Sequence, residues 1–308
     1  MRNKFQGKGL GLPSYLTRRK FLQLSTAGVA SAGVAIAGDG TFIEANRPRL
    51  VSIEIPLARL DEAWDGFRIA QLSDFHYDDY FSVVPLRKAI DIIRPLKPDI
   101  IVLTGDFVTS PLSHVGGTRA EAIARVIEPC AQLLSHLQAP SGVLAVLGNH
   151  DLGTNASQII DVLQSHAIPV LRNRSVVLER DKKRLWFAGV DDVLEGRPDL
   201  RQALLGVPPT DPVVLLSHEP DWADHVALYP IDLQLSGHSH GGQIRLPFLG
   251  APYLPTLGRK YPWGLRRIES LYLYTNCGIG TIRVPMRLNC PPEVTVFTLR
   301  ANPKVSLR

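Results

Sequence analysis

Short apolar segments alternate with amphipathic segments from residue 48 onward. Four or five consecutive apolar residues are typical of a buried strand, whereas apolar residues that recur every three or four positions are typical of a helix packed on one face. In the first half of the chain, this pattern predicts strands at 67–73, 100–103 and 143–147 and helices at 84–96, 118–137 and 156–166.

The second half of the chain is richer in strands. The same pattern predicts strands at 185–190, 213–216, 232–235, 270–275 and 293–299, with short helices near 198–205 and 220–227. Alternating strands and helices, followed by a region that is mostly strands, indicate a layered α/β fold with two packed sheets.

The first 37 residues have the composition of a secretion signal. Residues 1–20 are basic and include Arg18 and Arg19, a weakly apolar stretch spans 26–37, and Ala35-Ile36-Ala37 fits a cleavage site. The paired arginines before Phe-Leu are typical of the twin-arginine export route. The apolar stretch is short and poor in Leu and Ile for a membrane span. Two alternatives stay open: an uncleaved leader that acts as a weak anchor, and an amphipathic helix with chance arginines.

The excess of basic residues belongs to this leader. The sequence has 34 Lys+Arg against 29 Asp+Glu, and residues 1–38 contain six of the bases and no acid. The rest of the chain therefore carries 28 bases against 29 acids. A nearly neutral globular part lacks the basic surface that binds phosphate backbones, so the charge argues against nucleic acid as a partner.

The three cysteines have no metal-binding spacing. Cys130, Cys277 and Cys290 lie far apart in the sequence, which argues against a zinc ribbon and against a disulfide-stapled scaffold. A Cys277–Cys290 bridge is one alternative. Buried small apolar side chains are the interpretation that we favour.

Side chains able to bind a metal follow five of the predicted strands. Asp74 and His76 follow the first strand, and the other four strands are followed by Asp106, by Asn149-His150-Asp151, by His218, and by His238 with His240. Ligands of α/β sheets bind at the carboxyl ends of the strands. Each motif alone has an ordinary structural explanation, but five in succession indicate one site.

The residue types fit a site for two divalent cations. Residues two apart in an extended segment point to the same side, so we expect Asp74 with His76, and His238 with His240, to face one site. Carboxylates, imidazoles and an amide without thiolates suit borderline metals such as Mn, Fe and Zn. One carboxylate can bridge two ions, as in two-metal phosphatases and nucleases.

This series of motifs resembles the calcineurin-like metallophosphoesterase family. Residues 284–293 and the Gly241-Gly242-Gln243 extension resemble its bacterial YkuE/YaeI-like branch. The resemblance implies a four-layer α-β-β-α sandwich and a dinuclear metal site. It divides the chain into a signal segment (1–37), an extension with a first strand (38–65) and a metallophosphoesterase domain (66–308).

The resemblance also implies a role for each residue. One metal ion would be held by Asp74, His76, Asp106 and His240, and the other by Asp106, Asn149, His218 and His238. His150 resembles the catalytic histidine of the family, and an imidazole can protonate a leaving alkoxide near neutral pH. Asp151 could orient His150, or it could cap the following helix from the solvent side.

The implied reaction is hydrolysis of a phosphodiester or pyrophosphate by an exported enzyme, in the periplasm or on the outer face of the cytoplasmic membrane. Residues 246–257 are uncharged and precede Arg259, Lys260 and Trp263, which fits a peripheral membrane contact and a lipid-linked substrate such as UDP-diacylglucosamine. The same segment could instead pack on its own sheet. The alternatives are a phosphomonoesterase, a soluble nucleotide diesterase and a non-catalytic binding module stabilised by metal.

Overall fold

The computed structural model describes residues 17–109 and 118–301. Its contacts divide the chain into two units, Met1–Asp39 and Gly40–Arg308. In the first unit, helix α1 (Arg18–Gly38) begins after Thr17, whose hydroxyl accepts a hydrogen bond from the backbone N–H of Lys20. Arg18 and Arg19 are exposed, and most of the basic leader lies outside the described residues.

The apolar leader continues into a longer helical stretch than the sequence predicts. Residues Arg18–Asn46 form 29 helical residues that are long and apolar enough to cross a membrane, near the N-terminus. This helical stretch is longer than the apolar stretch expected at 26–37, because the helical turns continue beyond residue 37. Length and composition of this kind suit both a signal sequence and a membrane anchor.

The second unit contains a five-stranded mixed sheet. Its strand order is β1–β11–β2–β3–β4, and β11 runs antiparallel to β2 but parallel to β1. Strands β2, β3 and β4 are parallel, so their carboxyl ends meet at one edge. The bounds are β1 (Arg49–Leu57), β2 (Arg68–Leu72), β3 (Ile100–Thr104), β4 (Val143–Val146) and β11 (Glu293–Ala301).

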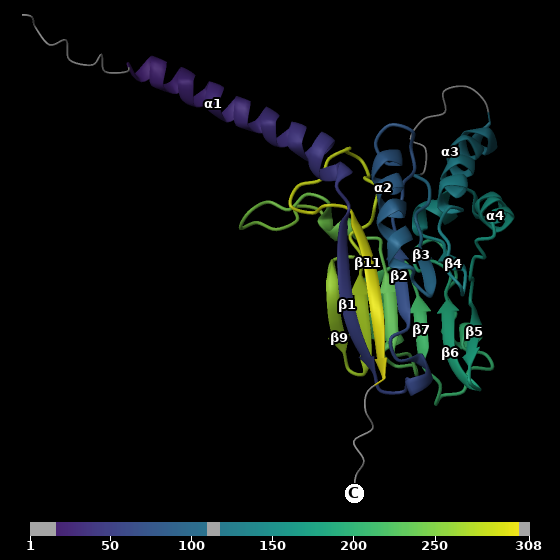
Figure 1. Cartoon of the computed structure of the whole chain (residues 1–308). Coiled ribbons are helices and arrows are strands. Elements are labelled where there is room, and N and C mark those ends of the chain that lie inside the picture. Colours follow the sequence, from purple (N-terminus) through teal and green to yellow (C-terminus); the bar gives the residue numbers. More distant parts are fainter. Residues whose placement is uncertain (1–16, 110–117, 302–308) are drawn as a thin grey trace, which may run out of the picture. The chain divides into compact units, whose positions relative to one another are not determined.

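A six-stranded mixed sheet packs on the first one. Its order is β5–β6–β7–β8–β10–β9, with antiparallel strands only at the two edges. Figure 1 shows β6 and β7 pointing toward the end where loops of the C-terminal half gather. The bounds are β5 (Arg174–Arg180), β6 (Lys183–Gly189), β7 (Val213–Leu216), β8 (Leu233–Ser236), β9 (Gly264–Ile268) and β10 (Leu271–Thr275).

Three apolar cores among the described residues define four layers, as the family resemblance implies. One core lies between the first sheet and helices α2, α3 and α4, a second lies between the sheets, and a third lies under the short helices α5 and α6. The helices are α2 (Val83–Ile93), α3 (Arg119–Leu134), α4 (Asn149–Ser165), α5 (Leu200–Ala203) and α6 (Ala223–Val226), and the single turns are η1 (Asp39–Ile43), η2 (Glu44–Asn46), η3 (Glu62–Trp64), η4 (Arg94–Leu96), η5 (Pro220–Trp222) and η6 (His240–Gly242).

Most predicted elements agree with the structure to within a few residues, and the differences have local causes. Helix α4 begins at Asn149 rather than 156, since a non-helical residue, Asn155, interrupts a helix that starts directly at the metal-binding motif. The sequence did not predict the edge strands β5 and β9, because their side chains are partly exposed and carry several charges.

Candidate metal centre

Five parallel strands from both sheets end at the candidate metal centre. Strands β2, β3 and β4 lead to Asp74, Asp106 and Asn149, and strands β7 and β8 lead to His218 and to His238 with His240. Gln71 of β2 fixes the two sheets to each other, because its buried amide donates hydrogen bonds to Thr104 Oγ1 of β3 and Ser236 O of β8. The structure thus brings every predicted ligand to one end of the sandwich.

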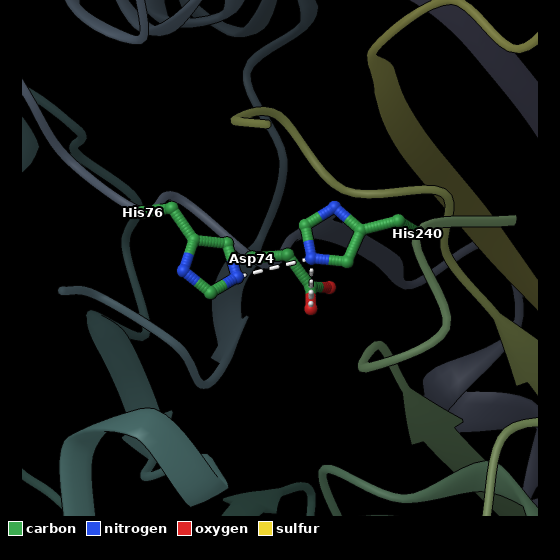
Figure 2. A group of neighbouring side chains, drawn as sticks. All are labelled: Asp74, His76 and His240. Carbon is green, nitrogen blue, oxygen red and sulfur yellow. Dashed lines mark hydrogen bonds and ion pairs between the residues drawn. The ribbon is translucent and has the colours of Figure 1, made fainter. Parts of the chain in front are cut away.

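One group of ligand atoms comes from Asp74, His76 and His240 (Figure 2). His240 Nε2 lies 3.5 Å from Asp74 Oδ1 and 3.0 Å from His76 Nε2. His76 Nε2 also lies 3.4 Å from Asp106 Oδ2. All four side chains are buried. Carboxylate and imidazole atoms that converge in this way form a compact N/O set for one cation.

A second group comes from Asp106, His218 and His238. His218 Nε2 lies 3.2 Å from Asp106 Oδ2, the oxygen that also faces His76. His238 Nδ1 lies 3.0 Å from Asn149 Oδ1, which brings the amide to the same place. Asp106 is therefore shared between the two groups, as a bridging carboxylate must be.

The chemistry of His218 provides a test of whether these residues fit a cation. Its Nδ1 donates a hydrogen bond to Thr104 O at 2.7 Å, while its buried Nε2 has no hydrogen-bond partner and faces Asp106. Burial acts to lower the pKa of His218, but the adjacent carboxylate of Asp106 raises it well above its usual value. A cation between His218 Nε2 and Asp106 would take the place of the proton on His218 Nε2, so the arrangement fits a metal.

The protonation of the other groups suits metal binding. Burial lowers the pKa of His76 to about 3 and that of His238 to about 4, and it also lowers the pKa of His240. These imidazoles are therefore neutral at pH 7, which is the form that binds a metal. Burial acts to raise the pKa of Asp106, but His218 outweighs it and keeps that pKa well below its usual range.

The backbone does not present these ligands as an extended strand would. Asp74, His76, Asp106, His238 and His240 all have positive φ angles, between 39° and 69°. The expectation that Asp74 with His76, and His238 with His240, project from extended segments is therefore wrong. The left-handed conformation is strained for residues other than glycine. Such residues concentrate at functional sites, where packing holds them in place.

Close backbone approach explains two glycines beside the ligands. A Cβ on Gly148 would collide with Asp106 Oδ1, and a Cβ on Gly237 would collide with Ser73 Oγ and Asp74 Oδ2. These positions tolerate only glycine, because each neighbouring strand end has to pass directly against a carboxylate.

Asp151 anchors the loop that carries Asp106. Its oxygens accept hydrogen bonds of 2.9–3.2 Å from the backbone N–H groups of Asp106, Phe107, Val108 and Gly148. Asp151 is fully buried, so the expectation of a solvent-facing cap is wrong, although it does cap α4 at Gly148. Its carboxylate oxygens are occupied by backbone amides of the metal loops.

Other neighbours that the sequence did not single out orient the imidazoles. Thr109 Oγ1 lies 2.9 Å from His76 Nδ1, and Thr256 O lies 2.7 Å from His238 Nε2. Partners of this kind fix the orientation of a metal-binding imidazole. The sequence around Thr109 and Thr256 does not indicate these contacts, because threonine side chains and backbone carbonyls are common in loops.

His150 lies beside the two groups of ligand atoms. A ring nitrogen of His150 falls within 4.8 Å of ligand atoms of His76 and Asp106, and its backbone N–H donates to Asp106 Oδ1 at 3.0 Å. His150 lines a cavity of about 470 Å³ together with Asp106, Asn149, His238 and His240. This position is suitable for a residue that acts on a group bound by the metals.

The uncharged segment after the metal loop divides into two parts. Residues 246–250 form a tight hairpin closed by hydrogen bonds between Leu246 and Gly250, and Phe248 at its tip is fully exposed. Leu254 is half-buried, and Thr256 contacts His238. Lys260 pairs with Asp224 at 2.6 Å. The hairpin at 246–250 is therefore exposed, as one alternative expects, whereas the part around Leu254 packs on the fold, as the other expects.

Cys277 and Cys290 are near neighbours behind the metal loop. Both are buried free thiols, and each would contact a Cβ placed on Gly241. Cys130 is also free and buried, which agrees with the favoured interpretation of the cysteines as small buried side chains.

The α/β sandwich and its clustered carboxylates and imidazoles define a metal-dependent hydrolase of phosphate esters. A sequence profile of the calcineurin-like phosphoesterase family matches residues 67–242, and the chain belongs to this family. It is 35% identical to the uncharacterized metallophosphoesterase YkuE of Bacillus subtilis, over 93% of this chain and 98% of that protein. It is 32% identical to phosphodiesterase YaeI of Escherichia coli, over 92% and 99%.

A further relative has a lipid substrate in its name. The chain is 29% identical to the UDP-2,3-diacylglucosamine pyrophosphatase LpxG of Chlamydia trachomatis, over 83% of this chain and 90% of that protein. The family membership shows that this protein is a metal-dependent phosphoester hydrolase and that divalent metal is its cofactor.

Proposed function

We propose that this protein is a dinuclear phosphodiesterase or pyrophosphatase that acts on a lipid-linked substrate. The observation that carries the dinuclear site is the shared Asp106 Oδ2, which lies 3.4 Å from His76 Nε2 on one side and 3.2 Å from the buried His218 Nε2 on the other. One ion, of Mn, Fe or Zn, would be held by Asp74, His76, Asp106 and His240, and a second by Asp106, Asn149, His218 and His238.

Metal ions held by these residues would supply Lewis acidity for polarising the phosphoryl oxygens and activating a water. The chain supplies the rest. His150 lines the cavity beside the ligands and is the residue that would protonate the leaving oxygen. Asp151 and Thr109 act as positioning residues, because they hold the Asp106 loop and the His76 ring. The buried ligand atoms exclude bulk water from the side of the metals that faces the sheets.

The cavity beside the metals favours an amphiphilic substrate. Apolar side chains of Leu194, Ile244, Ile282 and Val284 line it, and Arg283 is the one Arg or Lys among the described residues that line it. An apolar wall accommodates hydrocarbon, while a guanidinium pairs with phosphate. The printed name of the LpxG relative, a pyrophosphatase of a diacylglucosamine nucleotide, supports the same substrate class. We therefore favour a lipid-linked pyrophosphate such as UDP-diacylglucosamine.

We also propose export for this enzyme. Residues 1–37 would act as a twin-arginine signal read by the translocase through Arg18 and Arg19, followed by an extension (38–65) and the catalytic domain (66–308). The apolar helix near the N-terminus supports this proposal, whether it is cleaved or retained as an anchor. The enzyme would then work in the periplasm or on the outer face of the cytoplasmic membrane.

A substrate panel on the full chain tests this function. Protein stripped with a chelator should lose hydrolysis of an aryl phosphodiester and regain it with Mn²⁺, and an aryl monoester should be a poorer substrate. Faster hydrolysis of the monoester would favour the phosphomonoesterase alternative. Full diester hydrolysis after exhaustive chelation would refute the proposed function.

A further inference from the structure

Two chain segments line one wall of the cavity, 243–250 through Gln243 and Ile244 and 282–288 through Ile282, Arg283 and Val284, and a third segment, 40–44, packs beside them. Segment 243–250, which contains the hairpin 246–250, is joined to segment 282–288. Arg245 N–H donates to Leu288 O at 2.8 Å, and the Gln243 amide donates to Ile282 O and Val284 O. Segment 40–44 packs on segment 282–288, since Arg287 N–H donates to Gly40 O at 3.0 Å. Segments 243–250 and 282–288, green and yellow in Figure 1, lie at one end of the sandwich.

Large apolar side chains are exposed on these three segments and on the adjoining Tyr253. We call them the rim surface: Phe42 (72% exposed), Phe248 (108%), Leu249 (79%), Tyr253 (50%) and Val284 (46%). Tyr253 and Val284 also line the cavity, so the rim surface is continuous with its apolar wall. Neighbouring exposed apolar side chains of this size, at the opening of a cavity, mark a binding surface.

The charges on the rim surface favour an anionic, amphiphilic partner. Arg283 is exposed, donates a hydrogen bond to Tyr253 Oη at 3.0 Å and stacks on the Tyr253 ring. The nearby carboxylate of Glu44 is engaged by the backbone N–H groups of Asn289 and Cys290. A tyrosine and an arginine beside apolar side chains form the combination that lies at the headgroup level of membranes.

Chain connectivity identifies that partner as a lipid bilayer. The apolar helix α1 ends at Gly38, and Gly40 is already packed on Arg287, next to the rim surface. Two residues of chain span at most about 7 Å, so a bilayer that holds α1 comes close to Gly40. We propose that the rim surface docks on the bilayer to which the N-terminal helix attaches the enzyme, and that the cavity opens there toward a lipid-linked substrate. This inference rests on the proposed lipid substrate and on a leader that is retained as an anchor, and it names the surface that reaches the substrate.

Site-specific fluorescence quenching on the full chain tests the contact. The native thiols of Cys130, Cys277 and Cys290 are buried, so a thiol-reactive fluorophore will label a cysteine introduced by Leu249→Cys or, as a control, by Leu228→Cys. Leu228 is also 79% exposed, but it lies on the connection that enters β8, at the opposite end of that strand from the site. The labelled proteins are reconstituted in phosphatidylcholine and phosphatidylglycerol vesicles with brominated acyl chains.

We expect strong quenching of the probe at 249 and little at 228. Equal quenching at the two positions would overturn the proposed docking. A kinetic arm uses Phe248→Ser with Leu249→Ser: the apparent KM for a lipid-linked diester in vesicles should rise at least tenfold, because two apolar contacts are lost, while hydrolysis of a soluble aryl diester is unchanged. An equal loss on both substrates would also count against docking.

The two arms separate this inference from the proposed function. Metal-dependent hydrolysis of the soluble diester without selective quenching at 249 would leave the proposed reaction intact and refute docking. Selective quenching at 249 in a protein that hydrolyses no phosphodiester would support docking and refute the proposed reaction.

Discussion

Asp151→Asn is a sensitive probe of how the fold holds the metal site. Each oxygen of Asp151 accepts two backbone N–H groups, so four amides of the loops at 106–108 and 148 depend on one buried carboxylate. An asparagine side chain has the same shape but presents N–H donors on one side. Two of the four amides would therefore face another donor and lose their hydrogen bonds.

The size of the effect follows from these contacts. A buried N–H group left without its acceptor costs about 1–3 kcal/mol, so losing two such hydrogen bonds lowers the free energy of unfolding by roughly 2–6 kcal/mol. At about 2–4 °C per kcal/mol for a domain of this size, the Tm should fall by on the order of 10 °C. Metal affinity should fall as well, because the Asp106 loop loses its anchor.

Differential scanning calorimetry and metal titration of two variants measure both effects. Asp161→Asn is the matched control, since Asp161 lies exposed on the same helix α4, and its Tm should change little. If Asp151→Asn melted and bound metal like Asp161→Asn, the anchoring role of Asp151 would be wrong.

Two further predictions concern export and pH. Replacing Arg18-Arg19 by Lys-Lys should hold the protein in the cytoplasm, because the twin-arginine receptor reads the guanidinium pair rather than charge alone, and unchanged export in a fractionation assay would indicate the general secretory route. Burial raises the pKa of Asp74 to about 6 in the metal-free protein, so below pH 6 a proton must leave before metal binds. Titrations should show affinity falling as the pH drops through 6, and an affinity that is constant between pH 7.5 and 5 would contradict this prediction.

The sequence predicted which side chains come together because these residues follow buried strands in a recognisable order. Strands β2, β3, β4, β7 and β8 are short apolar runs, and parallel strands place their carboxyl ends together. The local geometry could not be predicted. The positive φ angles of Asp74 and His238 depend on hydrogen bonds from other segments, such as the one from the Asp74 backbone N–H to Gly105 O.

Tertiary contacts also determined the features that the sequence left open. Asp151 accepts hydrogen bonds from residues 106–108, more than forty positions away, so its sequence neighbourhood suggested only a helix cap or a partner that orients His150. Within the uncharged segment, Phe248 is exposed and Leu254 is half-buried, although both are apolar residues beside prolines. Composition alone cannot distinguish them, because the difference arises from the hairpin and from packing next to Gly242.

The most direct test of the account measures metal content and turnover on the same samples. Elemental analysis and aryl diester hydrolysis are compared for the native protein, Asp106→Ala and His150→Ala. The account predicts close to two ions in the native protein, loss of the ions in Asp106→Ala, and near-native metal content in His150→Ala with turnover lowered by roughly 10²–10⁴-fold. A His150→Ala protein without metal, or an Asp106→Ala protein that keeps both ions, would contradict the proposed division between metal ligands and proton donor.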